Sequence, residues 1–117
     1  MTRYLLLIHA DEAAWEALSP DERQPTYERY SSLAREMEKR GHGRGGDELA
    51  SSTAAKVVRV RSGERTIVDG PFAETKEQLG GYFMVECDLE TALDYAARLP
   101  AADYGAVEVR QIAEGPS

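Results

Sequence analysis

Two side chains of this sequence have the types needed for general acid–base chemistry, namely His9 and Asp69. A histidine titrates near neutral pH, and a neighbouring carboxylate completes a pair that can move a proton. Each residue ends a predicted strand, so the pair forms only if these two strand ends meet. Asp11 and Glu12 follow His9 closely, which leaves a carboxylate-rich metal site as an alternative. Their spacing matches no dedicated metal motif, so we predict no metal.

The other reactive residue types lack the neighbours that would activate them. No histidine is placed by the sequence to activate Cys87, so we expect a buried, inert thiol. The serines lie in no nucleophile-elbow pattern. Glycines at 41, 43 and 46 have the spacing of a dinucleotide fingerprint, but that motif follows a strand and opens a helix. Here the order is reversed, so we predict a flexible connection, an exposed His42 and no cofactor.

Charge and composition exclude several classes of partner. The 117 residues carry a formal charge of −7, which argues against nucleic acid and against an anionic membrane surface. Arginines 59, 61 and 65 cluster on one predicted hairpin, and we interpret them as a solvated face. The lone cysteine suits a reducing cytoplasm. No apolar run reaches the ~20 residues of a membrane helix, so we expect a cytoplasmic protein.

The elements that must position these residues begin with a strand at 3–9. Its continuous apolar character predicts burial on both faces. A short helical turn around residues 13–15 follows.

A capping box formed by Ser19 and Glu22 marks the next helix start. Pro25 removes a backbone donor, so we expect a separate turn at 20–23 and a main helix at 25–40. Gly41 ends that helix. Apolar residues at helical spacing form its core stripe; they are Tyr27, Tyr30, Leu33, Ala34 and Met37.

The second half of the chain contains the clearest hairpin, with alternating strands at 56–61 and 65–69 joined by a three-residue turn. A strand at 81–87, a helix at 89–99 capped by Asp88, and a last strand at 106–112 complete the pattern. The core face of this second helix is predicted at helical spacing; its members are Leu89, Ala92, Leu93, Ala96 and Leu99.

This order predicts an α+β fold of ferredoxin-like βαββαβ type, with an antiparallel sheet and two helices on one face. We expect one domain at 1–112 and a frayed tail at 113–117. The helices leave one sheet face uncovered, and an apolar open face needs a partner. We therefore expect a homodimer through that open face.

The segment from Val68 to Tyr82 contains the signature Asp-Gly-Pro-Phe at 69–72. With the opening strand, the segment 96–100 and the final strand, this segment resembles the DGPF subgroup of the YCII-related family. The resemblance implies a dimeric α+β barrel and no established reaction. Members are sometimes encoded beside extracytoplasmic-function sigma factors. The family's proposed histidine–aspartate pair matches Tyr27 and Lys39 here, so it is not carried over.

The signature also has a local interpretation as a strand-exit corner. Gly70 permits an unusual backbone angle, Pro71 fixes the next one, and Phe72 turns inward as an anchor. The corner can also rim a pocket, since loops on rigid scaffolds often bind ligands. The candidate ligand-binding residues are Asp69, Phe72, Glu74, Thr75, Lys76 and Tyr82.

Three functions are therefore open. The first is a small-molecule-binding homodimer without catalysis, because no complete catalytic set is present. The second is an isomerase, lyase or oxygenase that uses His9 and Asp69 as its acid–base pair, by analogy of fold alone. The third is a regulatory partner in sigma-factor signalling, whose acidic surface would suit a basic partner.

Overall fold

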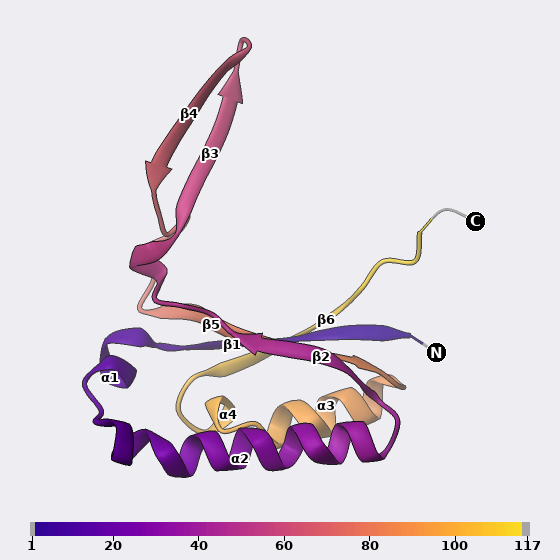
Figure 1. The fold of residues 1–117 in the computed structure, drawn as a ribbon. Coiled ribbons are helices and arrows are strands. Elements are labelled where there is room, and N and C mark those ends of the chain that lie inside the picture. The colour runs from indigo at the N-terminus through magenta and orange to yellow at the C-terminus, as the bar shows by residue number, and fades with distance from the viewer. Residues whose placement is uncertain (1, 116–117) are drawn as a thin grey trace.

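Strands and helices alternate along residues 2–115, the part of the chain that the computed structural model describes (Figure 1). Their order is β1 (Arg3–Asp11), α1 (Glu12–Glu16), α2 (Pro20–Lys39), β2 (Gly43–Glu48), the 3-10 helix η1 (Ser52–Ala54), β3 (Lys56–Arg61), β4 (Glu64–Asp69), β5 (Glu77–Glu86), α3 (Leu89–Arg98), α4 (Ala101–Tyr104) and β6 (Ala106–Gln111). The mixed α+β class predicted from the sequence is confirmed.

Four strands form one antiparallel sheet in the order β2-β5-β1-β6. The long helix α2 and helix α3 cover one face of it (Figure 1). Tyr4 and Leu6 of β1 point to that face and are buried, whereas Leu5 and Leu7 alternate to the other face and are half-buried. The prediction that this strand is buried on both faces is therefore wrong for the single chain.

The uncovered side of the sheet is called the open face below. Leu5 pairs with Met84 and Leu7 with Tyr82 across β1 and β5, so these four half-buried side chains share it. Apolar side chains thus form the centre of the open face.

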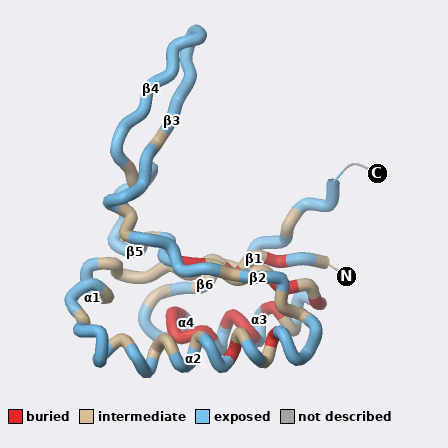
Figure 2. The backbone as a smooth tube through the Cα atoms, in the orientation of Figure 1, coloured by how far each residue is buried: buried red, intermediate tan, exposed pale blue. Residues whose placement is uncertain are grey.

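The core lies between the sheet and the helices, where Figure 2 shows the buried segments. Tyr95 is fully buried at its centre, and its hydroxyl is hydrogen-bonded to His42 Nδ1 at 2.8 Å. The prediction that His42 is exposed is wrong, because the buried phenol needs this partner. Leu89 and Leu93 are 50% and 45% exposed, so α3 presents Tyr95 to the core in their place. Cys87 is buried, as predicted, and burial raises the pKa of its thiol.

Helix α2 is continuous from Pro20, which corrects the predicted break before Pro25. The capping box of Ser19 and Glu22 is present, so the first turn is fixed independently of the proline. Pro25 removes only the bond to the carbonyl of Asp21, and both residues are exposed, so that carbonyl is not left unpaired in the core. Gly41 follows the helix with φ +78°, as predicted for the cap.

The glycine-rich segment is a strand and not the flexible connection that we predicted. Strand β2 pairs with β5 at the sheet edge through its backbone, which needs no side chains. A β-carbon at Gly46 would lie 2.6 Å from the carbonyl oxygen of Tyr82, so glycine allows this close approach.

Strands β3 and β4 form a separate two-stranded sheet, called the arm below (residues 56–69). Figure 1 shows the arm rising away from the four-stranded sheet, and Figure 2 shows it almost wholly exposed. Its turn has two residues, Ser62 and Gly63, both with positive φ, and not the three predicted. The rest of the described chain, the four-stranded sheet with its helices, is called the body.

Beyond β6, residues 113–115 have no regular structure. The remainder of the predicted frayed tail, residues 116–117, lies outside the described residues.

Candidate functional site

A cavity of about 510 Å³ lies between the N-terminal half of α2 and the sheet. Helix α2 forms its floor and strands β1, β2 and β5 its roof, while α1 and the segment after β2 close one end. Six aromatic residues are among its lining, namely Trp15, Tyr27, Tyr30, Tyr82, Phe83 and Tyr104. A concave, mainly apolar space with a few polar groups is the usual form of a small-molecule site.

The aromatic rings hold one another in fixed positions. Trp15 and Tyr27 meet edge to face with ring centroids 5.4 Å apart, and Tyr30 and Phe83 stack at 6.3 Å. Such pairs are stabilising beyond the area that they bury. These two ring pairs therefore form a packed part of the cavity wall.

Arg23 is the cationic side chain of this cavity. Its guanidinium lies 5.4 Å from the centre of the Trp15 ring, and it donates to the carbonyl oxygens of Trp15 and Glu16 at 3.2 and 3.1 Å. Within residues 2–115 no carboxylate forms an ion pair with it. Arg23 thus keeps both its charge and unused N–H donors.

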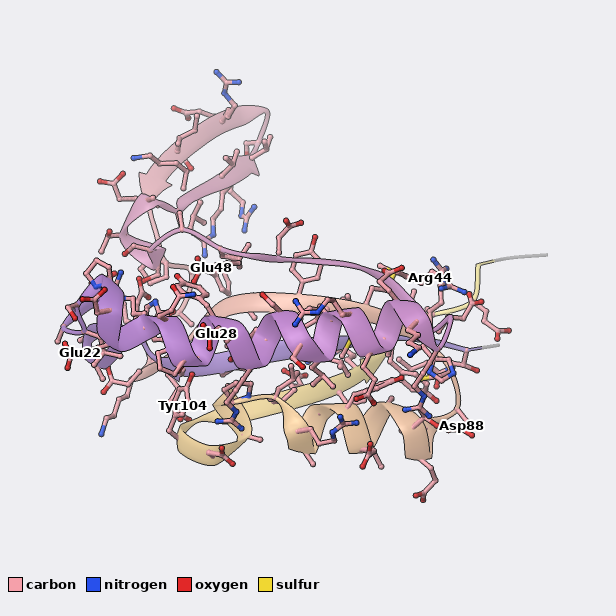
Figure 3. The ribbon with its side chains drawn as sticks, turned by 60° about the horizontal axis from the view of Figure 1, so that its bottom comes forward. Glu22, Glu28, Arg44, Glu48, Asp88 and Tyr104 are labelled. Atoms are coloured by element: carbon pink, nitrogen blue, oxygen red, sulfur yellow. The ribbon has the colours of Figure 1, made fainter. Side chains whose placement is uncertain are left out.

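Tyr27 and Glu48 form the polar contact of the cavity. The Tyr27 hydroxyl donates to both carboxylate oxygens of Glu48, at 3.0 and 3.1 Å. Burial, followed by the Glu48 carboxylate, raises the pKa of Tyr27, so the phenol stays protonated and acts as a donor. Figure 3 shows Glu48 on the side of α2 next to β2 and Tyr104 on the other side.

Glycines leave part of the cavity roof without side chains. Gly46, Gly80 and Gly81 all line it, and Gly80 is the extra residue of a bulge opposite Ile8 and His9. A β-carbon at Gly80 would meet nothing within 4 Å. The empty volume thus arises where the sheet has no side chains to fill it.

The structure gives His9 and Asp69 different partners. His9 Nε2 lies 3.3 Å from Glu108 Oε1 on the neighbouring strand β6. Asp69 ends β4, its side chain is 78% exposed, and it forms an ion pair with Lys56 of the same arm. Neither contact joins the two candidates, so their acid–base pairing stays a prediction.

The acids beside His9 point elsewhere. Asp11 caps α1 by accepting from the amide of Ala14, and Glu12 accepts from Ser51 Oγ and the Ser52 amide, both at 2.6 Å. These bonds lower the pKa of Glu12. In the part of the chain that is described, no group of three or more potential ligands is placed to hold a metal ion.

The predicted ligand-binding residues are divided between two spaces. Tyr82 is among the lining residues of the cavity described above, although its side chain lies on the open face. Phe72, Thr75 and Lys76 line a wide hollow of about 1600 Å³ at the base of the arm, together with His9. Asp69 and Glu74 are among the lining residues of neither space.

The signature corner differs from the prediction in two respects. Phe72 is 78% exposed and lies beneath the guanidinium of Arg59, so it is not an inward anchor. Gly70 has no positive φ; its amide donates to Ala55, whose Cβ would lie 2.8 Å from an added β-carbon. Glycine is therefore needed for close approach, and the Gly70–Pro71 peptide is cis.

Sequence reasoning did not select Trp15, Arg23 and Glu48 as site residues, and it placed Tyr27 in the core stripe. The available signal was the spacing of two tyrosines. They stand three residues apart on one helix face, and their hydroxyls need polar partners when buried. The partner of Tyr27 is Glu48 of β2, which no local pattern connects to that face.

The four-stranded antiparallel sheet, its covering helices and the cavity define a small α+β protein with a candidate ligand site. The chain matches the YCII-related domain over residues 2–115. It is also 37% identical over 113 residues to an uncharacterised protein of Rhizobium meliloti (strain 1021). The aligned region covers 94% of this chain and 91% of that protein. The chain therefore belongs to the YCII-related family. Among its described helices, none combines the length and apolar character needed to cross a bilayer.

Proposed function

We propose that this protein is a homodimeric small-molecule-binding domain whose ligand occupies the cavity between α2 and the sheet. The strand order β2-β5-β1-β6 supports a ferredoxin-like fold, and Asp69-Gly70-Pro71-Phe72 supports the DGPF subgroup. The buried thiol of Cys87 is consistent with a reducing cytoplasm.

The observation that carries the proposal is the cavity itself. Its volume of about 510 Å³ lies within the usual range of ligand sites. The aromatic pairs offer flat surfaces, and ordered aromatic walls favour a flat, apolar molecule because little side-chain freedom is lost on binding.

The guanidinium of Arg23 implies that this ligand carries an anionic group. Glu48 is already engaged by Tyr27, and Glu12 by Ser51 and Ser52, so these carboxylates are satisfied within the chain. Arg23 has no carboxylate partner among the described residues, and guanidinium groups recognise carboxylates well. The ligand class that fits is an aromatic carboxylate.

Isothermal titration calorimetry with 2-naphthoate tests this assignment, with neutral 2-naphthamide as the comparison probe. We expect saturable binding of 2-naphthoate that weakens about tenfold in Arg23→Gln, the loss of one charged hydrogen-bonding group. Ala34→Phe, which fills the cavity from its floor, should abolish binding of both probes. Arg35→Gln, an exposed change on the same helix, is the matched control. Unchanged affinity in Ala34→Phe would contradict the assigned site.

The dimer is proposed to form through the open face. Leu5, Leu7, Tyr82 and Met84 form its apolar centre, and charges of both signs surround them, including Arg110 with Glu108 and Arg44 with Glu86. A two-fold interface brings the same patch together twice, so a rim with both signs is self-complementary.

Sedimentation equilibrium tests the dimer. Leu7→Glu places a charge in the centre of the open face and should give a monomer. Leu93→Glu adds the same charge at a 45% exposed leucine of α3, on the helix side, and should leave the dimer intact. The reverse result would place the interface on the helices and would refute the proposed face.

A further inference from the structure

The arm exposes more apolar side chain than a free hairpin tolerates. Val58, Val60, Ile67 and Val68 are each 53–57% exposed. An isolated two-stranded hairpin is marginal in water, and exposed strands with apolar faces invite association. We therefore expect a partner to cover these apolar side chains of the arm.

Three of these side chains share one face of the arm. Val58 is paired with Ile67, and Val60 follows two residues along β3, so all three project on the same side. Val57 and Val68 form a cross-strand pair on the other side. The first face is the larger apolar surface.

The arm also has the opposite charge to the body. Residues 56–69 contain four basic and two acidic side chains, a net +2, whereas the whole chain carries −7. The remainder therefore carries −9. An acidic body is the charge-complementary partner of a basic arm, and every copy of this chain presents one.

The position of the arm matches that partner. Figure 1 shows the arm standing on the side of the sheet that the helices leave uncovered. A second copy seated on the open face would therefore lie beside the arm, and two-fold symmetry would place its own arm beside the first copy.

We propose that the arm is a clasp, which holds a second copy of this chain through the face formed by Val58, Val60 and Ile67 and through Arg65, which lies on the same face opposite Val60. This inference rests on the dimer of the proposed function, and it adds a second contact outside the open face. Arg65 is then an interface residue, whereas Arg59 and Arg61 alternate to the face of Val57 and Val68.

The test measures the dimer dissociation constant by sedimentation. Changing Val58, Val60 and Ile67 to threonine keeps the β-branched shape and should raise the constant at least tenfold. The matched change of Val57 and Val68 to threonine should raise it less than threefold. Arg65→Gln should weaken the dimer at 50 mM salt and much less at 500 mM, because salt screens surface charge. Arg35→Gln with Lys39→Gln is the charge control on α2.

The two proposals fail in distinguishable ways. If Leu7→Glu gives a monomer while the threonine and glutamine arm variants match the wild type, the clasp is refuted and the open-face dimer stands. A wild-type protein that is monomeric at millimolar concentration would refute both. A stronger effect of the Val57 and Val68 variant would refute the assigned face of the arm. Circular dichroism of each variant confirms that the body is folded.

Discussion

The body and the arm use the same kinds of residue in opposite surroundings. In the body, Leu6 and Val85 have no exposed surface, since the sheet and two helices enclose them. In the arm, Val60 and Ile67 alternate in the same strand pattern, yet more than half of each side chain is exposed. Apolar character in a strand thus predicts that a residue will be covered, but the covering layer need not belong to the same chain.

This difference has a functional meaning. The body contains its own core, caps and cavity, so its proposed ligand site needs no second chain. The arm contains its ladder, its tight turn, two hydrogen bonds from side chains to its backbone and the ion pair of Lys56 with Asp69, which is exposed and therefore contributes little. Ligand binding and clasping are expected to be separable by mutation.

The largest effect should come from truncating equivalent side chains in the two regions. Leu6→Ala removes a fully buried side chain and should lower the free energy of unfolding by about 2–5 kcal/mol. Val60→Ala, measured at a concentration where the protein is monomeric, should change it by less than about 0.5 kcal/mol. Urea unfolding followed by circular dichroism measures both. Equal losses in the monomer would show that the arm packs on its own body.

Sequence signals sufficed where the deciding contacts are local. The capping box at Ser19, the cap at Gly41 and the arm itself depend on neighbours a few residues apart, and each was predicted. The long-range features were not. Tyr95 enters the core because His42, 53 residues away, bonds its hydroxyl. The glycine segment is a strand because β5 supplies its backbone partners.

The candidate site was less predictable than the fold for the same reason. The cavity joins α1, α2, β2 and β5, and no spacing in the sequence connects Arg23 with Trp15 or Tyr27 with Glu48. The signature segment was conspicuous in the sequence, yet Phe72 lies at the arm's base with most of its ring exposed. The Asp-Gly-Pro-Phe motif at 69–72 thus lies at the junction between the arm and the body, and not at the cavity.

A smaller effect should separate two glycines of the cavity roof. In Gly46→Ala the new β-carbon lies 2.6 Å from Tyr82 O and 2.8 Å from Phe83 Cδ1, and crowding of this kind costs about 1–3 kcal/mol. In Gly80→Ala it meets nothing within 4 Å, so stability should change by less than about 0.5 kcal/mol. Thermal and urea unfolding measure the pair. A larger loss in Gly80→Ala would show that the bulge needs its glycine for backbone freedom.

The smallest effect should appear at Glu12, where the body holds the segment that leads to the arm. Hydrogen bonds from Ser51 and Ser52 lower the pKa of this carboxyl below its ordinary value of 4.5. A depressed pKa stabilises the folded state above pH 4.5, and the gain is lost as pH falls through the folded-state value. Wild type should therefore be more stable than Glu12→Gln at pH 7, and the difference should shrink steadily below pH 4.5.

Urea unfolding at pH 7, 5, 4 and 3 measures this difference. Glu28→Gln is the matched control, because Glu28 lies on the outer surface of α2 (Figure 3) and is exposed. If the Glu12→Gln difference persists unchanged to pH 3, the serines bind the side chain through its shape and not its charge. In that case the junction between body and arm does not depend on pH. If the difference closes as expected, acid weakens the contact between Glu12 and the segment that leads to the arm.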